Sequence, residues 1–179
     1  PGRTLFPYTT LFRSLTNILP EGSVLVSNEV IHHRANILAE NMIKWGYPTG
    51  IVTEADPDRL KSAGETFDFI LVDAPCSGEG MFRKDEAARS EWSLQNVELC
   101  ARRQQRILSA AWEMLQPGGL LAYSTCTFNT LENEDNLAFL IDTFGAEPVA
   151  LDVLTEWQIA PQLKGEAPAY RFFPHKVAG

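Results

Sequence analysis

Residues 69–80 read FILVDAPCSGEG and join an apolar run to a loop that carries an acid, a cysteine and two glycines. The four apolar residues at the start are typical of a strand that is covered on both faces of a parallel sheet. Asp73 ends this run, and the residue types that follow it are common in turns. Ligands of open parallel α/β sheets bind at the carboxyl ends of the strands, so this segment is a candidate site, with a plain turn as the alternative.

Predicted strands and helices alternate on both sides of this segment. β-rich runs predict further strands at residues 24–27, 49–53, 120–124 and 147–151. Apolar residues at helical spacing predict helices over about 34–45, over about 93–115 and from about 131 onward. The last helix should carry Glu132, Glu134 and Asp135 in its first turn, where carboxylates favour the positive end of the helix dipole. This alternation predicts an α/β fold with a mainly parallel, doubly wound sheet.

Length and composition favour one domain with a hydrophobic core, because the chain has 179 residues and is 45% hydrophobic. Residues 1–14, PGRTLFPYTTLFRS, show no period and are interrupted by Pro7, so we interpret them as a segment foreign to the fold. The regular pattern covers residues 15–150. Residues 151–179 are interpreted as a C-terminal tail of that domain.

Composition also limits the classes of function. The net charge of −8 is opposite to the basic character of a self-sufficient nucleic-acid binder. No apolar run approaches the roughly 20 residues that span a membrane, and no signal peptide is visible. The three cysteines have no zinc or disulfide spacing, which favours a reducing compartment. We therefore expect a soluble, cytoplasmic monomer that holds no metal.

Two cysteines follow two different predicted strands, Cys76 in Ala-Pro-Cys-Ser and Cys126 in Ser-Thr-Cys-Thr. These strand ends should meet at one edge of a parallel sheet, which would bring both thiols together with Asp73. Glu29 and Asp56 follow two other strands, where carboxylates of Rossmann-like folds hold the polar groups of nucleoside cofactors. Local alternatives are a buried structural thiol for Cys126, and helix caps for Glu29 and Asp56.

Six motifs extend this pattern into a family resemblance. They are VSNEV (26–30), TEADPDRL (53–60), DAPCSGEGMFRKD (73–85), EWSLQNVELCARRQ (91–104), LQPGGLLAYSTCTFNTLENE (115–134) and RFFPHK (171–176). From about Leu15 to Lys176 the chain resembles the Nol/Nop/Sun family of S-adenosylmethionine-dependent RNA cytosine-5 methyltransferases, most closely the bacterial RsmF-like branch. The pair DAPCSGEGMFRKD and YSTCTF is the most specific part of the match.

The resemblance implies a Rossmann-like class I methyltransferase fold, with residues 15–150 as a partial catalytic domain. It implies that Cys126 is the nucleophile and that Cys76 assists release of the product. It also implies that Glu29, Asp56 and Asp73 lie in the pocket for S-adenosylmethionine. Asp73 is equally compatible with a hydrogen bond to the cytosine.

The resemblance implies that the partner is RNA, either ribosomal RNA or transfer RNA. We expect Asp73, Pro75 and Arg83 to contact it. Residues 79–106 contain six basic and five acidic residues, a net charge of +1 against −8 for the chain, so this segment is relatively positive. A cytosine in paired RNA is out of reach, which means that the target is single-stranded or flipped out.

Two thiols suit the implied reaction. Carbon C5 of cytosine is a poor nucleophile, but a thiolate that adds at C6 turns the ring into an enamine-like species that attacks a methyl donor. The C5 proton must then leave and the thiol must be eliminated. One cysteine can form the bond while the other helps to break it.

The chain also departs from the family pattern. Family members carry a glycine-rich loop after a first strand, and neither is found here, so we expect an incomplete sheet and weak binding of the cofactor. The main alternative is therefore an inactive methyltransferase-fold fragment or a binding scaffold. A redox dithiol is a third interpretation, although no C-x-x-C motif is present. Cys100 is expected to be a core residue of the long helix.

Overall fold

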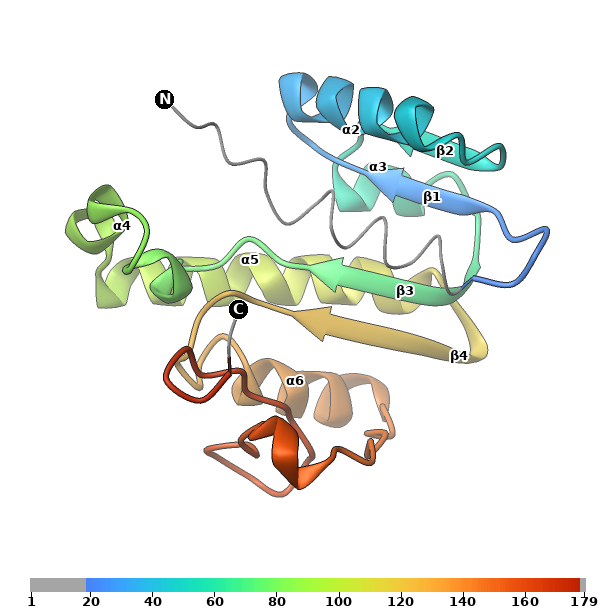
Figure 1. Ribbon diagram of the computed structural model, residues 1–179. Helices are drawn as coiled ribbons and strands as arrows, with labels where there is room; N and C mark the ends of the chain where they lie inside the picture. The colour runs from blue at the N-terminus through green and yellow to red at the C-terminus, as the bar shows by residue number, and fades with distance from the viewer. Residues whose placement is uncertain (1–18, 178–179) are drawn as a thin grey trace. The chain divides into compact units, whose positions relative to one another are not determined.

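The computed structural model describes residues 19–177, which divide into two compact units (Figure 1). The first unit extends to Ala63 and the second begins at Gly64. The composition of the chain did not predict this boundary. The foreign segment expected at residues 1–14 lies outside the described residues and stays a prediction.

The first unit is a strand–helix–strand–helix segment. Its elements are β1 (Leu25–Asn28), α2 (His32–Trp45), β2 (Gly50–Thr53) and α3 (Pro57–Lys61). Strands β1 and β2 are parallel, with Leu25 opposite Gly50 and Asn28 opposite Thr53. Helix α2 is followed by Gly46 at its C-cap, which has a φ of 63° in the left-handed region that glycine adopts without cost.

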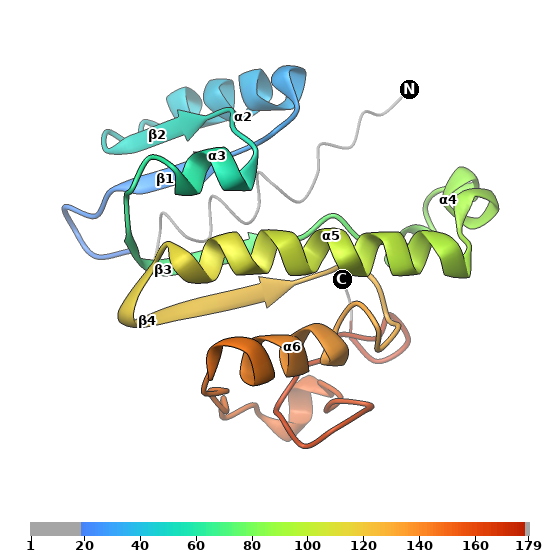
Figure 2. The ribbon, with the colours of Figure 1, turned by 180° about the vertical axis from the view of Figure 1, so that it is seen from behind.

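The second unit contains the longest helix and the two longest strands of the described structure. Its elements are β3 (Phe67–Asp73), η1 (Glu79–Met81), α4 (Glu86–Glu91), α5 (Leu94–Glu113), β4 (Leu115–Ser124), α6 (Glu134–Phe144) and η2 (Thr155–Trp157). Strands β3 and β4 are parallel, and α5 runs along them (Figure 2). Sheet and helices share a buried apolar cluster of Val72, Ala74, Leu108, Ala111 and Leu140. This packing holds the ends of β3 and β4 in place.

The α/β fold with parallel strands is confirmed. Within the described residues the strands form two separate parallel pairs, β1 with β2 and β3 with β4, so the sheet is incomplete as expected. No helix among these residues is both long and apolar enough to cross a membrane.

Four details of the prediction were wrong. The long helix ends at Glu113 instead of Leu115. Strand β4 begins at Leu115 and so includes the Gln-Pro-Gly-Gly segment. Opposite this segment, the pairing register of β3 shifts between Phe67 and Phe69. Residues 147–151 form no strand in the described structure. Helix α6 begins at Glu134, so Glu132 precedes the helix instead of lying in its first turn.

Candidate active site

The candidate site is formed by the two loops that follow β3 and β4. The last residues of these strands, Asp73 and Ser124, lie opposite each other, and the Ser124 hydroxyl donates to Asp73 Oδ1 at 3.0 Å. The loops continue side by side, which brings the sulfur atoms of Cys76 and Cys126 to 3.1 Å from each other. The prediction that the two thiols lie together is confirmed. Parallel pairing in register is the reason, because it delivers both loops at the same edge of the sheet.

The two thiols have different environments. Cys126 is exposed and Cys76 is partly buried. The hydrogen bond from Cys76 lowers the pKa of the Cys126 thiol. The same hydrogen bond, together with burial, raises the pKa of Cys76. Of the two thiols, Cys126 therefore ionises more readily and faces solvent, whereas Cys76 retains its proton more strongly.

Glycines allow the two loops to approach each other closely. The amide of Gly80 donates to the carbonyl oxygen of Cys126 at 2.7 Å. A Cβ atom at Gly80 would overlap that oxygen, so a larger residue does not fit. Gly78 has a φ of 80°, which only glycine adopts readily. Both glycines of the Ser-Gly-Glu-Gly segment are thus required by the geometry.

Side chains connect the two loops at further points. Glu79 accepts hydrogen bonds from the Phe128 amide at 2.7 Å and from Asn129 Nδ2 at 3.3 Å. The hydroxyls of Ser77 and Thr127 are 3.0 Å apart. Each cysteine thus has neighbours in its own loop that are bonded to the opposite loop, and this holds the sulfur atoms in their positions.

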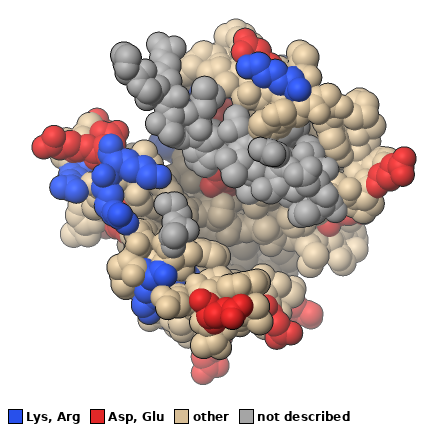
Figure 3. All heavy atoms as spheres, in the orientation of Figure 1, with Lys and Arg blue, Asp and Glu red and all other residues tan. Residues whose placement is uncertain are grey.

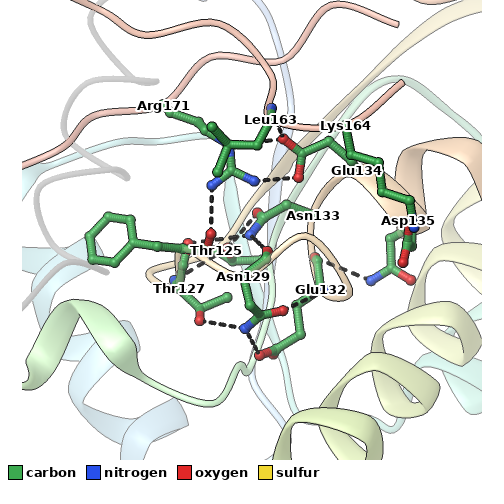
Figure 4. Close-up of polar contacts among 12 residues, drawn as sticks. Thr125, Thr127, Asn129, Glu132, Asn133, Glu134, Asp135, Leu163, Lys164 and Arg171 are labelled. Atoms are coloured by element: carbon green, nitrogen blue, oxygen red, sulfur yellow. Dashed lines mark hydrogen bonds and ion pairs between the residues drawn. The ribbon is translucent and has the colours of Figure 1, made fainter. Parts of the chain in front are cut away.

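Glu132 lies beneath both loops and has no exposed surface. Its Oε2 accepts from the Ser77 amide at 3.0 Å and from Gln104 Nε2 at 2.7 Å. Its Oε1 accepts from Asn129 Nδ2 at 2.8 Å (Figure 4). Gln104 also donates to the Pro75 carbonyl at 2.9 Å. One buried carboxylate therefore joins both loops to helix α5.

Sequence reasoning missed this role of Glu132. The signal that was available is the spacing Asn129-x-x-Glu132, which resembles a capping box. The Asn129 Oδ1 accepts from the Glu132 amide at 2.9 Å, so the two residues bond reciprocally. Nothing in the sequence indicated that the carboxylate points inward.

The C-terminal segment is attached to the Cys126 loop by a buried ion pair. Arg171 is 6% exposed, binds both carboxylate oxygens of Glu134 and donates to the Phe128 carbonyl at 2.8 Å (Figure 4). Burial opposes ionisation of Glu134, but the hydrogen bonds from Arg171 and from the Leu163 amide outweigh it and lower the pKa of Glu134. The segment is thus part of the site's framework.

Two predicted RNA-contacting residues lie close to these loops. Pro75 is exposed next to Cys76. Arg83 is exposed and donates from Nη1 to the Pro174 carbonyl at 3.4 Å.

Cys100 is buried in α5, as expected for a core residue, and burial raises the pKa of its thiol.

The other predicted cofactor ligands, Glu29 and Asp56, belong to the first unit. Glu29 accepts from the Ile31 amide at 3.0 Å and pairs with Arg34 at 3.0 Å. Asp56 caps α3 by accepting from the Asp58 amide at 3.1 Å. The cap that the sequence suggested is therefore present at Asp56 but not at Glu29, because α2 has Ile31 at its N-cap and no side-chain capping bond. The cofactor role of both residues stays a prediction. Among the described residues, no three His, Cys, Asp or Glu side chains are grouped so that they could hold a metal ion.

Comparison with known proteins identifies the family. A family model described as "16S rRNA methyltransferase RsmB/F" matches residues 9–179. The chain belongs to this RsmB/F family.

Two similar proteins are named as RNA methyltransferases. The chain is 41% identical over 139 residues to ribosomal RNA small subunit methyltransferase F of Aeromonas hydrophila, a match that covers 77% of this chain and 29% of that protein. It is 39% identical over 141 residues to the tRNA (cytosine(49)-C(5))-methyltransferase of Pyrococcus abyssi, covering 75% of this chain and 45% of that protein. The chain thus spans less than half the length of either relative.

A solved structure shows the same fold. It is described as NSun6 from Pyrococcus horikoshii with SFG, and it superposes with a TM-score of 0.72 at 29% identity. The match covers 87% of this chain and 38% of the NSun6 chain. The Rossmann-like fold expected for the RsmB/F family member is therefore shown, over most of the chain.

Proposed function

We propose that this protein transfers a methyl group to carbon C5 of a cytosine in RNA, through a transient covalent bond between Cys126 and carbon C6. The observation that carries the proposal is the pair of sulfur atoms 3.1 Å apart at the ends of β3 and β4. Their pKa values shift in opposite directions, which favours ionisation at Cys126 and a retained proton at Cys76, the two forms that attack and elimination need. Membership of the RsmB/F family supports RNA as the substrate.

In the first step the exposed Cys126 thiolate adds to C6. The sulfur–C6 bond forms, and the electrons of the C5–C6 double bond move to C5, which becomes nucleophilic. The lowered pKa of Cys126 raises the fraction of thiolate that is ready to attack. The hydrogen bond from Cys76 stabilises the negative charge on the Cys126 sulfur before the cytosine binds.

In the last step the same bond breaks. C5 loses its proton to a base, the C5–C6 double bond reforms, and Cys126 leaves with the electrons of the sulfur–C6 bond. The Cys76 thiol is 3.1 Å from the leaving sulfur and stabilises it as a thiolate by its hydrogen bond. Without Cys76 we expect elimination to be slow, because the leaving thiolate has lost its hydrogen-bond donor.

S-adenosylmethionine, when bound, supplies the methyl group as a sulfonium electrophile. The chemistry of the available acceptors fits this cofactor, because Glu29, Asp56 and Asp73 each lie at or just beyond the carboxyl end of a strand that has a parallel partner. An ionised carboxylate has about four acceptor sites, so a local capping bond is compatible with a further bond to a ribose hydroxyl. In this proposal Glu29 and Asp56 bind the nucleoside, and Asp73 binds either the cofactor or the cytosine.

RNA approaches this site from the side of Pro75 and Arg83 in the proposed complex. Lys and Arg side chains gather over the region of helix α4, next to a few acids (Figure 3). The basic residues of the η1–α4 region are Arg83, Lys84 and Arg89, all exposed. They give the acidic chain a local attraction for phosphates.

The test uses the Aeromonas relative with its matching segment replaced by this chain, so that the thiols act in a protein of full length. Cys126→Ala should abolish methyl transfer to single-stranded RNA, while Cys76→Ala should accumulate a covalent RNA–protein adduct on denaturing gels. Cys100→Ala, which removes a buried thiol outside the loops, is the control and should do neither. An adduct that accumulates in Cys126→Ala but not in Cys76→Ala would reverse the roles, and turnover in both variants would refute the mechanism.

A further inference from the structure

Three aromatic rings lie in a row beside the Cys126 loop. The ring centroids of Phe128 and Phe173 are 5.6 Å apart with the planes tilted by 34°. The rings of Phe173 and His175 stack at 5.7 Å and 25°. Phe128 is two residues beyond Cys126, so their Cα atoms are within about 8 Å of each other. The row therefore begins two residues from the proposed nucleophile in the same loop.

Buried polar contacts hold this row in place. The amide of Phe128 donates to Glu79 at 2.7 Å, and its carbonyl accepts from the buried Arg171 at 2.8 Å. Arg171 precedes Phe173 by two residues and is itself fixed by Glu134. A rigid aromatic surface binds a flat ligand at a small entropic cost, because its side chains are already ordered.

The far end of the row is open and basic. Phe128 and Phe173 are partly buried, whereas His175 and the following Lys176 are exposed. Arg83 approaches the same segment, through its 3.4 Å hydrogen bond to the carbonyl of Pro174. The row thus ends in an exposed imidazole, with Lys176 next to it in the sequence and Arg83 bonded to the carbonyl of the residue before it. An aromatic face beside basic groups is typical of single-stranded nucleic-acid binding.

We propose that the row Phe128–Phe173–His175 is a stacking platform for the base next to the target cytosine, with Arg83 and Lys176 beside the phosphate. This inference rests on the proposed function, because it assumes that the cytosine reaches Cys126. A cytosine that enters the site leaves its neighbour without a stacking partner, and the His175 face replaces the lost contact. Every base has a π face, so the platform binds purines and pyrimidines alike.

The experiment measures binding of this chain to a short single-stranded RNA that carries one cytosine flanked by 2-aminopurine. Stacking quenches 2-aminopurine fluorescence, and anisotropy of an end label gives the affinity. His175→Ala and Phe173→Ala should each weaken binding by about 5- to 100-fold, the range expected when one base–aromatic stack is lost, and should reduce the quenching. His175→Trp should keep both signals.

Phe172→Ala is the matched control, because Phe172 is an exposed aromatic residue of the same segment, 58% exposed, that is not part of the row. It should change the affinity by less than about twofold. An equal loss in Phe172→Ala, unchanged quenching in His175→Ala, or absence of RNA binding by the parent chain would overturn the platform. The readout needs neither cofactor nor turnover, so a failure of methyl transfer with quenching intact would count against the proposed function alone.

Discussion

Single residues set the distance between the two thiols. Gly80 is required because the carbonyl of Cys126 occupies the space of a side chain, and the hydrogen bond between them holds the two loops together. Glu132 supports the same loops from below through the Ser77 amide and Asn129. A change at either position therefore acts on Cys76 and Cys126 without touching a sulfur atom.

Gly80→Ala should destabilise the protein by about 1–3 kcal/mol, the usual cost of forcing an extra carbon into a packed site. It should also slow alkylation of Cys126 by iodoacetamide at neutral pH several-fold, because displacement of the loop removes the hydrogen bond that lowers the pKa of Cys126. Peptide mass spectrometry measures the rate at that cysteine. Gly64→Ala, which is strained by a φ of 75° but has open space around it, is the control. An unchanged rate in Gly80→Ala would show that the loop tolerates the methyl group.

At the level of elements, the C-terminal segment depends on the ion pair of Arg171 and Glu134. Arg171→Ala should lower the free energy of unfolding by about 3–5 kcal/mol, because it leaves a buried carboxylate without its cation. Urea denaturation measures the change. The exposed pair of Lys164 and Asp135 provides the control, since Lys164→Ala should cost less than about 1 kcal/mol.

The effect of Arg171→Ala should also depend on pH. The folded pKa of Glu134 is lowered, so the pair contributes fully above the unfolded value of about 4.3 and loses its contribution as the pH falls through the folded pKa. The difference between parent and variant should therefore shrink below about pH 4. A difference that stays constant from pH 7 to pH 3 would show that lost packing, not charge, is responsible.

At the level of the whole molecule, the chain consists of two compact units that meet in sequence at Ala63 and Gly64. Residues 62–66 between them are exposed and form no helix or strand. We expect a glutamate-specific protease to cut first after Glu65, because exposed connections are the preferred sites of nicking. Mass spectrometry of a short digest identifies the first cut, and Glu65→Gln should delay it. A first cut inside α5 or α6 would contradict the division into two units.

Much of the fold and part of the site could be predicted from the sequence. The apolar run at β3, the strand-end position of Cys76 and Cys126, and the family motifs are all continuous in the chain, so local pattern and spacing reveal them. Parallel pairing then requires the two thiols to meet, which is why their closeness followed from the sequence.

Only the tertiary structure decided what surrounds those thiols. Glu132 and Ser77 are 55 positions apart, and Arg171 and Glu134 are 37 apart, yet each pair is buried and hydrogen-bonded. On sequence pattern, Glu132 is an ordinary acid near a helix start, and Arg171 is a basic residue of an exposed tail. Their burial depends on the packing of α5, α6 and the C-terminal segment. A charged side chain is buried only where distant residues supply its partners, and local propensity carries no information about those partners.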